Sequence, residues 1–441
     1  DCPCNAHHAM SAPPLHASPP APTAVPQPTG WPVLRLGFRP FYLGAALFAL
    51  LAIPLWVALF LGHGALAMPL SPLLWHAHEM LFGFAIAVIM GFLLTAVKAW
   101  TGLATPRGAF LAALALLWLA ARVAAVTGPY ALYALLDLAL LPLVAAVLTR
   151  LLLRARNRRN LPLAGMLMLL ALANGVFHLG VISAIKMSPL TPLYAALALI
   201  VMIECVIAGR VIPAFTMSAT PGLKLTVSVL VDRAAMALTA LALLLWVFAP
   251  AATAWNMGAG LALSLAAVAH VLRLLQWRPA ITRHRPILWI LHASYAWIPF
   301  GLALLAAARF GWIANSVGVH ALAIGATAGL IIGMITRTAR GHTGRALQVS
   351  RPEATAYALV MLAAATRVLL PLAMPAWLPM ALVVSAAAWS LAFAIYLFIY
   401  TPWLLQTRLR RLSSSARCCS LCSRAMKNPP PRSRLSTWTT Y

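Results

Sequence analysis

Acidic residues are scarce in this sequence, with 6 Asp and Glu among 441 residues against 32 Lys and Arg. Charged residues of both signs make up only 9% of the chain, whereas a soluble domain carries about a quarter. A chain that is 63% apolar and so poor in charge has no means of covering a water-soluble surface. The composition therefore excludes an ordinary soluble protein and predicts one that crosses a membrane several times.

Cysteine pairs and familiar catalytic motifs are also missing. The six cysteines have neither the paired spacing of a zinc site nor the pattern of a disulfide framework. Cys205 lies inside an apolar run and is expected to pack as a small buried side chain. The sequence contains no Gly-x-Ser-x-Gly, His-Glu-x-x-His or phosphate-loop motif, so nucleophilic catalysis is poorly supported.

Apolar segments of about the length that a helix needs to cross a bilayer follow one another between residues 35 and 407. No alternation with a period of two residues accompanies them, which favours helices over a β-barrel. The predicted fold is an all-α, polytopic membrane domain over 35–407, and residues 1–34 and 408–441 are expected to be disordered arms. The twelve predicted spans lie near 41–61, 76–97, 108–126, 130–153, 161–185, 190–217, 227–249, 251–276, 287–308, 315–336, 354–374 and 377–400.

Basic residues cluster before the first predicted span and in every second loop, whereas the opposite loops contain only Lys186 and Arg309. Cytoplasmic loops of membrane proteins carry the excess of Lys and Arg, so both termini and both arms are predicted to be cytoplasmic. Short basic clusters between spans are also unlike a nucleic-acid-binding surface, and no nucleic-acid partner is expected. The expected surroundings are a lipid bilayer.

The second and tenth predicted spans share a spaced motif, His-x4-Gly-x7-Gly-x9-Thr-Gly. It runs from His78 to Gly102 in one span and from His320 to Gly344 in the other. Small residues also recur at every fourth position in both, as in membrane helices that approach closely. Because eight helices separate the two spans, the motif predicts a four-helix unit repeated three times. Its middle copy, at the sixth span, is degenerate and contains Glu204 but no histidine.

Four histidines are predicted at one level near the outer side: His76 and His78 in the second span, His178 in the fifth and His320 in the tenth. Neutral imidazole is the commonest protein ligand of metals and the usual axial ligand of haem iron. We predict that His78 and His320, the repeat-related pair, bind a haem. His76 and His178 are then candidates for a second metal such as copper.

The alternative to a metal site is a purely structural role, in which these histidines only form hydrogen bonds within the helix bundle. Three charged residues are predicted at a similar depth near the outer side: Arg122, Asp137 and Arg367. Charged side chains inside a membrane are costly and usually functional.

A second group of candidates is predicted near the inner side. His270 lies near the end of the eighth span and His292 near the start of the ninth, so the two helices are expected to be neighbours that face a cofactor. Arginine pairs well with propionate groups. The cofactor-binding candidates on this side therefore also include Arg210, Arg337, His342 and Arg345. The loop that contains the last three is alternatively a simple positive anchor.

At these residues the sequence resembles the NnrS family of bacterial membrane proteins. The matching stretches are 36–41 (Leu-Gly-Phe-Arg-Pro-Phe), 75–80 (Trp-His-Ala-His-Glu-Met), 210–216 (Arg-Val-Ile-Pro-Ala-Phe-Thr), 291–299 (Leu-His-Ala-Ser-Tyr-Ala-Trp-Ile-Pro) and 341–345 (Gly-His-Thr-Gly-Arg). The resemblance implies a twelve-span protein of the cytoplasmic membrane with b-type haem and copper, associated with denitrification and protection against nitric oxide and nitrosative stress.

The resemblance does not assign a metal to any one histidine, name the electron donor, or tell binding of nitric oxide from redox turnover. Two other functions stay open. A secondary transporter of a metal ion or small anion would suit twelve helices, with Arg122, Arg210 and Arg367 placed to meet an anion. The other is a non-catalytic component that assists the assembly of another complex. Bound haem or copper would distinguish the nitric oxide-related function from the transporter and from the assembly component.

Overall fold

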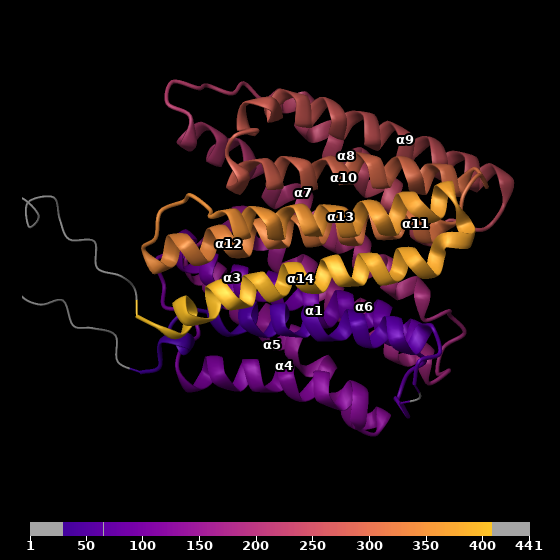
Figure 1. The fold of residues 1–441 in the computed structure, drawn as a ribbon, viewed down its shortest axis with the longest axis horizontal. Helices are drawn as coiled ribbons and strands as arrows, with labels where there is room; N and C mark the ends of the chain where they lie inside the picture. Colours follow the sequence, from indigo (N-terminus) through magenta and orange to yellow (C-terminus); the bar gives the residue numbers. More distant parts are fainter. Residues whose placement is uncertain (1–29, 65, 408–441) are drawn as a thin grey trace, which may run out of the picture.

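The computed structural model describes residues 30–64 and 66–407, and the arms predicted on either side lie mostly outside the described residues. The described part is built from helices, with no strand in it. Twelve helices, two of them composite, are long and apolar enough to cross a membrane, which confirms the predicted all-α polytopic fold. In Figure 1 their axes run roughly side by side, with α4 and α5 at one edge of the bundle and α8 and α9 at the opposite edge.

Ten spans are single helices: α1 (Phe38–Phe60), α4 (Ala109–Thr127), α5 (Tyr130–Arg154), α6 (Leu161–Val181), α7 (Leu190–Ala219), α8 (Val229–Phe248), α9 (Thr253–Gln276), α10 (Pro286–Arg309), α13 (Arg351–Ala373) and α14 (Leu378–Leu405). Short 3-10 turns precede four of them: η1 (Pro32–Leu34), η3 (Arg158–Asn160), η4 (Pro279–Thr282) and η6 (Pro375–Trp377). Several spans, including α10 and α13, have a proline in their first turn. Proline suits this position because it lacks the N–H that would have no hydrogen-bond partner at the start of a helix.

The second and tenth spans are both interrupted by a π-helical segment at the same place in the shared motif. The second consists of α2 (Pro72–His78), η2 (Glu79–Ala85) and α3 (Ile86–Thr101). The tenth consists of α11 (Asn315–His320), η5 (Ala321–Ala328) and α12 (Gly329–Thr343). Each first segment ends at the motif histidine, and each span ends before a left-handed glycine, with φ of 71° at Gly102 and 82° at Gly344.

The backbone therefore bears out the repeat between these two spans, and it adds a feature that the sequence pattern did not predict. A π-helical turn is rare inside an α-helix and is frequently found at functional sites. In both spans the segment follows directly after a histidine.

Glycines of the motif let these two spans lie close to their neighbours. A Cβ at Gly325 would lie 2.2 Å from Cδ2 of Trp297, and one at Gly333 would lie 2.7 Å from a methyl of Leu291, both on α10. In the other copy, a Cβ at Gly91 would lie 3.0 Å from Cβ of Phe41 on α1. The pairs α1–α3 and α10–α12 thus occupy equivalent places, as a repeating four-helix unit requires.

Spans two, six and ten surround the central axis of the bundle. The most apolar windows of spans two and ten are 78% and 72% buried, more than those of the other spans. Side chains of all three spans line two cavities that follow one another along this axis. Span six, the degenerate copy, therefore takes the third position around the axis that the repeat predicts for it.

The first and last spans meet at one end of the bundle. The Arg39 guanidinium donates hydrogen bonds of 2.8 Å to the carbonyl oxygens of Leu404 and Gln406. Figure 1 shows the start of α1 and the end of α14 at this common end. With an even number of spans, the first span begins and the last span ends on the same side of the membrane. Which side this is stays a prediction from the loop charges.

Replacing Gly325 by alanine is expected to destabilise the protein by about 1–3 kcal/mol, because the new methyl group overlaps the Trp297 indole and forces it to move. The matched control is Gly165→Ala in α6, where a Cβ meets open space and alanine improves helix propensity. Thermal unfolding midpoints in detergent measure both. Equal midpoints for the two variants would contradict the close packing of α10 on the tenth span.

Candidate functional site

The four histidines predicted at one level form two separate groups. His76 and His78 lie two residues apart on α2, which is about 200° around a helix. His76 consequently faces the central axis, where its ring lies 6.5 Å from the ring of His320. His78 faces away from the axis, and its ring lies 5.6 Å from the ring of His178.

The pairs predicted from the sequence are therefore not the pairs that the structure brings together. Within the described part of the chain, no ring contact or hydrogen bond joins His78 to His320, or His76 to His178. Repeat symmetry pairs residues with the same motif position, but the helix rotation between two neighbouring histidines decides which of them reaches the axis.

The group that contains His78 is organised by a buried arginine. Arg122 of α4 donates from Nη1 to both oxygens of Glu79, at 2.7 Å each, and from Nη2 to Oδ1 of Asp137 on α5. All three side chains are at most 5% exposed. Gly83 makes room for this arrangement, because a Cβ there would lie 3.0 Å from Nη1 of Arg122. One guanidinium thus joins spans two, three and four.

His78 fits between this network and α6. Its Nδ1 lies 2.7 Å from the Tyr133 hydroxyl and 3.1 Å from Oε1 of Glu79. Its Nε2 donates to Oδ1 of Asn174 at 2.9 Å and lies 3.4 Å from Oδ2 of Asp137. The imidazole is completely buried and has polar partners on both nitrogens.

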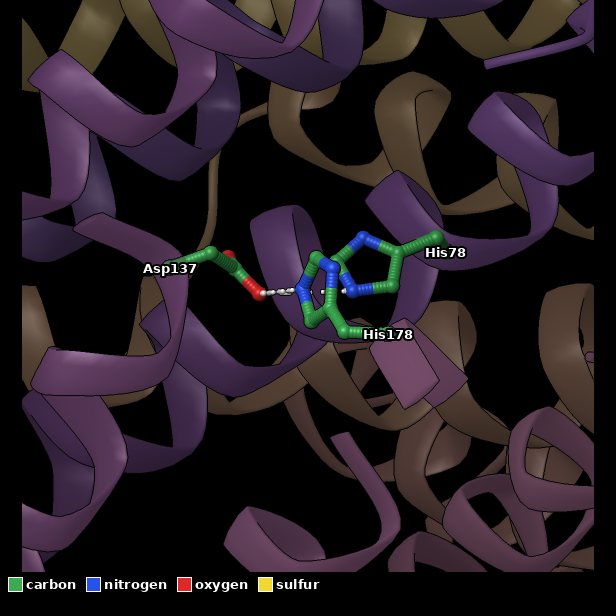
Figure 2. A group of neighbouring side chains, drawn as sticks. All are labelled: His78, Asp137 and His178. Carbon is green, nitrogen blue, oxygen red and sulfur yellow. Dashed lines mark hydrogen bonds and ion pairs between the residues drawn. The ribbon is translucent and has the colours of Figure 1, made fainter. Parts of the chain in front are cut away.

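His178 approaches the same carboxylate from α6. Its Nε2 lies 3.4 Å from Oδ2 of Asp137, and its Nδ1 lies 2.8 Å from the hydroxyl of Tyr130. Figure 2 shows one oxygen of Asp137 facing a nitrogen of each imidazole. We refer to His78, Asp137 and His178 as the histidine–aspartate group.

The spacing within the histidine–aspartate group is that of a metal site. Its ligand atoms lie within 4.8 Å of one another, and two of the separations are 3.4 Å. Two ligands bonded at about 2.1 Å to one tetrahedral ion lie about 3.4 Å apart. Each imidazole also has a partner for its other nitrogen, Tyr133 for His78 and Tyr130 for His178, as metal-binding histidines usually do.

The charges of this region also favour a cation. With both imidazoles neutral, the two carboxylates of Glu79 and Asp137 exceed the single guanidinium of Arg122 by one negative charge. An unbalanced charge in a buried site is expensive. The region therefore has a place for one more positive charge, either a proton on an imidazole or a metal ion that replaces it.

The second histidine pair lines a cavity of about 310 Å³ on the central axis, which we call the histidine cavity. His320 donates from Nδ1 to the carbonyl of Ser316 at 2.7 Å, which leaves Nε2 as the acceptor nitrogen of the neutral ring. His76 stacks on Trp56 with 3.9 Å between ring centroids, and its buried Nδ1 has no hydrogen bond to a described residue. Both rings thus keep nitrogen lone pairs for a ligand.

The two rings of this pair are nearly parallel, with 12° between their planes. The remaining wall is largely apolar and aromatic, with Phe84, Tyr194 and Trp389 among its residues. Arg367 of α13 lies close enough to both imidazoles to act on them electrostatically. Within the described chain this guanidinium has no acidic partner, in contrast to Arg122.

His270 is held in a hydrogen-bonded chain. Arg273 donates to the Tyr295 hydroxyl at 2.9 Å, Tyr295 donates to Nδ1 of His270 at 2.6 Å, and Nε2 of His270 donates to Thr239 at 2.7 Å. Both ring nitrogens are therefore occupied by protein groups. Cys205 lies beside the ring, 3.7 Å from Nε2, and is a buried free thiol, as its apolar surroundings in the sequence predict.

His292 lies near the hydrogen-bonded chain around His270, because α9 and α10 pack together as predicted. Its Nε2 donates to Thr216 at 3.0 Å, while its buried Nδ1 has no partner in the described residues. Trp277 separates the two histidines, with its ring 6.4 Å from His292 and 4.4 Å from Tyr295. They do not face one another directly.

The basic candidates of the same side are dispersed. Arg210 donates to Asn160 at 2.7 Å, and Arg337 lies over the ring of Phe215 at 3.7 Å. Arg345 lies over the ring of Trp403 at 4.2 Å, and His342 packs against Phe38 with 5.3 Å between ring centroids. Each is thus engaged with a different element of the bundle.

Three functional side chains were missed by the sequence analysis: Tyr130, Tyr133 and Asn174. Asn174 had a signal, because it is a polar residue in an apolar span four positions before His178 and therefore shares its helix face. The tyrosines had none, since Tyr is common near the ends of membrane spans for reasons of lipid contact.

Comparison with protein-family models gives a match to the NnrS protein over residues 32–408. The match covers all the described spans and includes both histidine groups. A direct comparison with curated proteins gives no match. The chain, a twelve-span membrane protein with histidines at its core, belongs to the NnrS family.

Proposed function

We propose that this protein is a haem- and copper-containing membrane protein that binds or processes nitric oxide, in the cytoplasmic membrane of a bacterium, with both termini cytoplasmic. The observation that carries the proposal is the histidine cavity, where His76 and His320 from two repeat-related spans face one space on the axis. Membership of the NnrS family, with its implied role in the response to nitric oxide, supports the same reading.

The donors around the histidine cavity suit a haem. Two imidazoles retain nitrogen lone pairs, aromatic side chains form part of the wall, and Arg367 offers a guanidinium without an acidic partner among the described residues. His76 and His320 would hold the iron, and Arg367 would pair with a propionate. A haem in this place would supply an iron centre for binding a diatomic gas or for single-electron transfer.

The protein's own groups set the conditions of that site. The hydrogen bond from Nδ1 of His320 to Ser316 fixes the ring orientation, and stacking on Trp56 fixes the ring of His76. The neighbouring cavity along the axis, about 70 Å³ in volume, is lined almost entirely by apolar side chains. A small uncharged gas partitions into such a space, whereas ions are excluded by its low polarity.

Copper is assigned to the histidine–aspartate group. Imidazole nitrogen binds copper, zinc, iron and nickel, and copper forms the most stable divalent complexes of that series. The two carboxylates of this region exceed its single guanidinium by one negative charge, which a bound metal ion would balance. Asn174 donates from Nδ2 to Oδ2 of Asp137 at 2.6 Å and would hold this ligand in place. Its Oδ1, which accepts from Nε2 of His78 in the structure, would give up that hydrogen bond when Nε2 binds the metal.

A secondary transporter of a small anion is the competing function, and a specific observation favours it. Arg367, which has no acidic partner in the described chain, acts electrostatically on His76 and His320 in the wall of the histidine cavity. An intramembrane arginine near a central cavity could meet an anion in a transporter. A purified protein that contains neither haem nor copper would favour this alternative.

Haem content is expected to fall about tenfold or more in His76→Ala and in His320→Ala, because each removes a side chain that would hold the iron. His63→Ala, which changes an exposed loop histidine, is the matched control and should keep the wild-type content. The pyridine haemochrome spectrum of purified protein gives haem per chain. Loss of haem in His78→Ala but not in His76→Ala would instead restore the pair predicted from repeat symmetry.

Copper content is expected to be lost in His178→Ala while haem content is kept, since the two sites lie on opposite sides of α2. Tyr130→Phe, which removes only the hydrogen bond to Nδ1 of His178, should weaken copper binding about 10- to 100-fold. Elemental analysis of copper, iron and zinc on one sample measures both variants, with His284→Ala as the exposed control. Simultaneous loss of haem and copper in His178→Ala would contradict two independent sites.

A further inference from the structure

Two cavities follow one another along the central axis, and the same three spans line both. The histidine cavity is bordered by residues such as Leu81, Leu197 and Ala323. The second one, which we call the apolar cavity, is bordered by positions further along the same helices, such as Ile89, Ile207 and Ile331. Repeat-related positions line both: Leu81 corresponds to Ala323, and Ile89 corresponds to Ile331.

Glu204 of α7 lies where these cavities adjoin. It is one of two lining side chains of the apolar cavity with an ionisable group, the other being Tyr42. Thr327 of η5 lines the histidine cavity and interacts with the Glu204 carboxyl. The pair therefore connects the two cavities near the middle of span six.

Glu204 differs from every other acid in the described chain. The remaining four form ion pairs with arginine: Glu79 and Asp137 with Arg122, Asp232 with Arg273, and Glu353 with Arg340. No described cation forms an ion pair with Glu204. An ionised carboxylate without such a partner is very unfavourable in an apolar site inside a membrane, so this carboxyl is held in its neutral, protonated form.

Two polar atoms at this point also lack hydrogen bonds. Oε2 of Glu204 and Oγ1 of Thr327 are both buried, and neither has a well-formed hydrogen bond to another described residue. Buried polar atoms are nearly always satisfied, and exceptions occur at sites that bind a water, an ion or a ligand. Because Glu204 lines one cavity and the interacting Thr327 lines the other, these two atoms form a polar contact between the cavities.

We propose that Glu204 is a proton-transfer group, which delivers its proton through Thr327 to a ligand bound in the histidine cavity. The Glu204 O–H bond breaks as Oγ1 of Thr327 accepts the proton, and the original Thr327 hydroxyl proton passes to the acceptor in the cavity. A proton from bulk water then restores the Glu204 carboxyl. No electron is transferred in this step, and only the identity of the acceptor rests on the proposed function.

The surroundings of Glu204 contain few other titratable groups. On its own helix Cys205 follows it, and across the apolar cavity α1 contributes Tyr42. The walls from α3, α10 and α12 contribute apolar side chains to that cavity. Beyond Thr327 the histidine cavity contains His76, His320 and Tyr194. Arg367 acts electrostatically on both of these imidazoles.

Infrared spectroscopy tests the inference without any cofactor. With only six acids in the chain, a protonated carboxyl should give one resolved C=O band at neutral pH, which shifts in ²H₂O. The band is expected to vanish in Glu204→Gln and to stay in the control Asp232→Asn, where the acid is ion-paired. Thr327→Val should shift the band and Thr327→Ser should restore it. A band that survives in Glu204→Gln, or no band in wild type, would overturn the proposal.

The link to the histidine cavity is tested on haem-loaded protein by the pH dependence of its midpoint potential. Wild type and Thr327→Ser should show a potential that falls with pH. Glu204→Gln and Thr327→Val should show a flatter slope for the haem that each variant retains. Unchanged slopes in both variants would refute proton transfer to this cavity. If the protein contains no haem, the infrared result still decides whether Glu204 is protonated. The proposed haem function and the proposed role of Glu204 can therefore be refuted separately.

Discussion

Charge pairing inside the bilayer is the constraint on which the rest of this structure depends. Four of the five acids in the described chain form an ion pair with an arginine from another span, and Arg122 binds both Glu79 and Asp137. Breaking a buried pair of this kind costs about 3–5 kcal/mol, because it leaves an uncompensated charge. These pairs tie spans two, three and four into one rigid unit, and they hold Asp137 where His78 and His178 can share it.

One short helix separates two sites of different chemistry. His76 and His78 are two residues apart, yet one faces an aromatic cavity on the axis and the other faces a charged network with carboxylates. The π-helical segment that follows His78 recurs after His320, so the backbone is altered at the same place in both copies. The two copies thus share a histidine at this position, and the partners of that histidine differ between them.

The central axis combines close packing with open space. Glycines bring spans two and ten against α1 and α10. Other side chains of these two spans line two cavities together with span six. Span six contributes Glu204 and contains no histidine. A threefold arrangement with one divergent copy thus supplies imidazoles from two spans and a carboxyl group from the third.

The sequence by itself determined the twelve helices, the repeat and the set of titratable residues inside the membrane, because hydropathy and spacing are local properties of the chain. It also indicated the family through five short stretches. The pairing of His76 with His320, the meeting of His178 with Asp137, and the lack of an arginine at Glu204 were decided by the tertiary structure. Such pairings depend on helix rotation and on contacts between spans that are up to eight helices apart, and a single sequence specifies depth along a helix far better than direction around it.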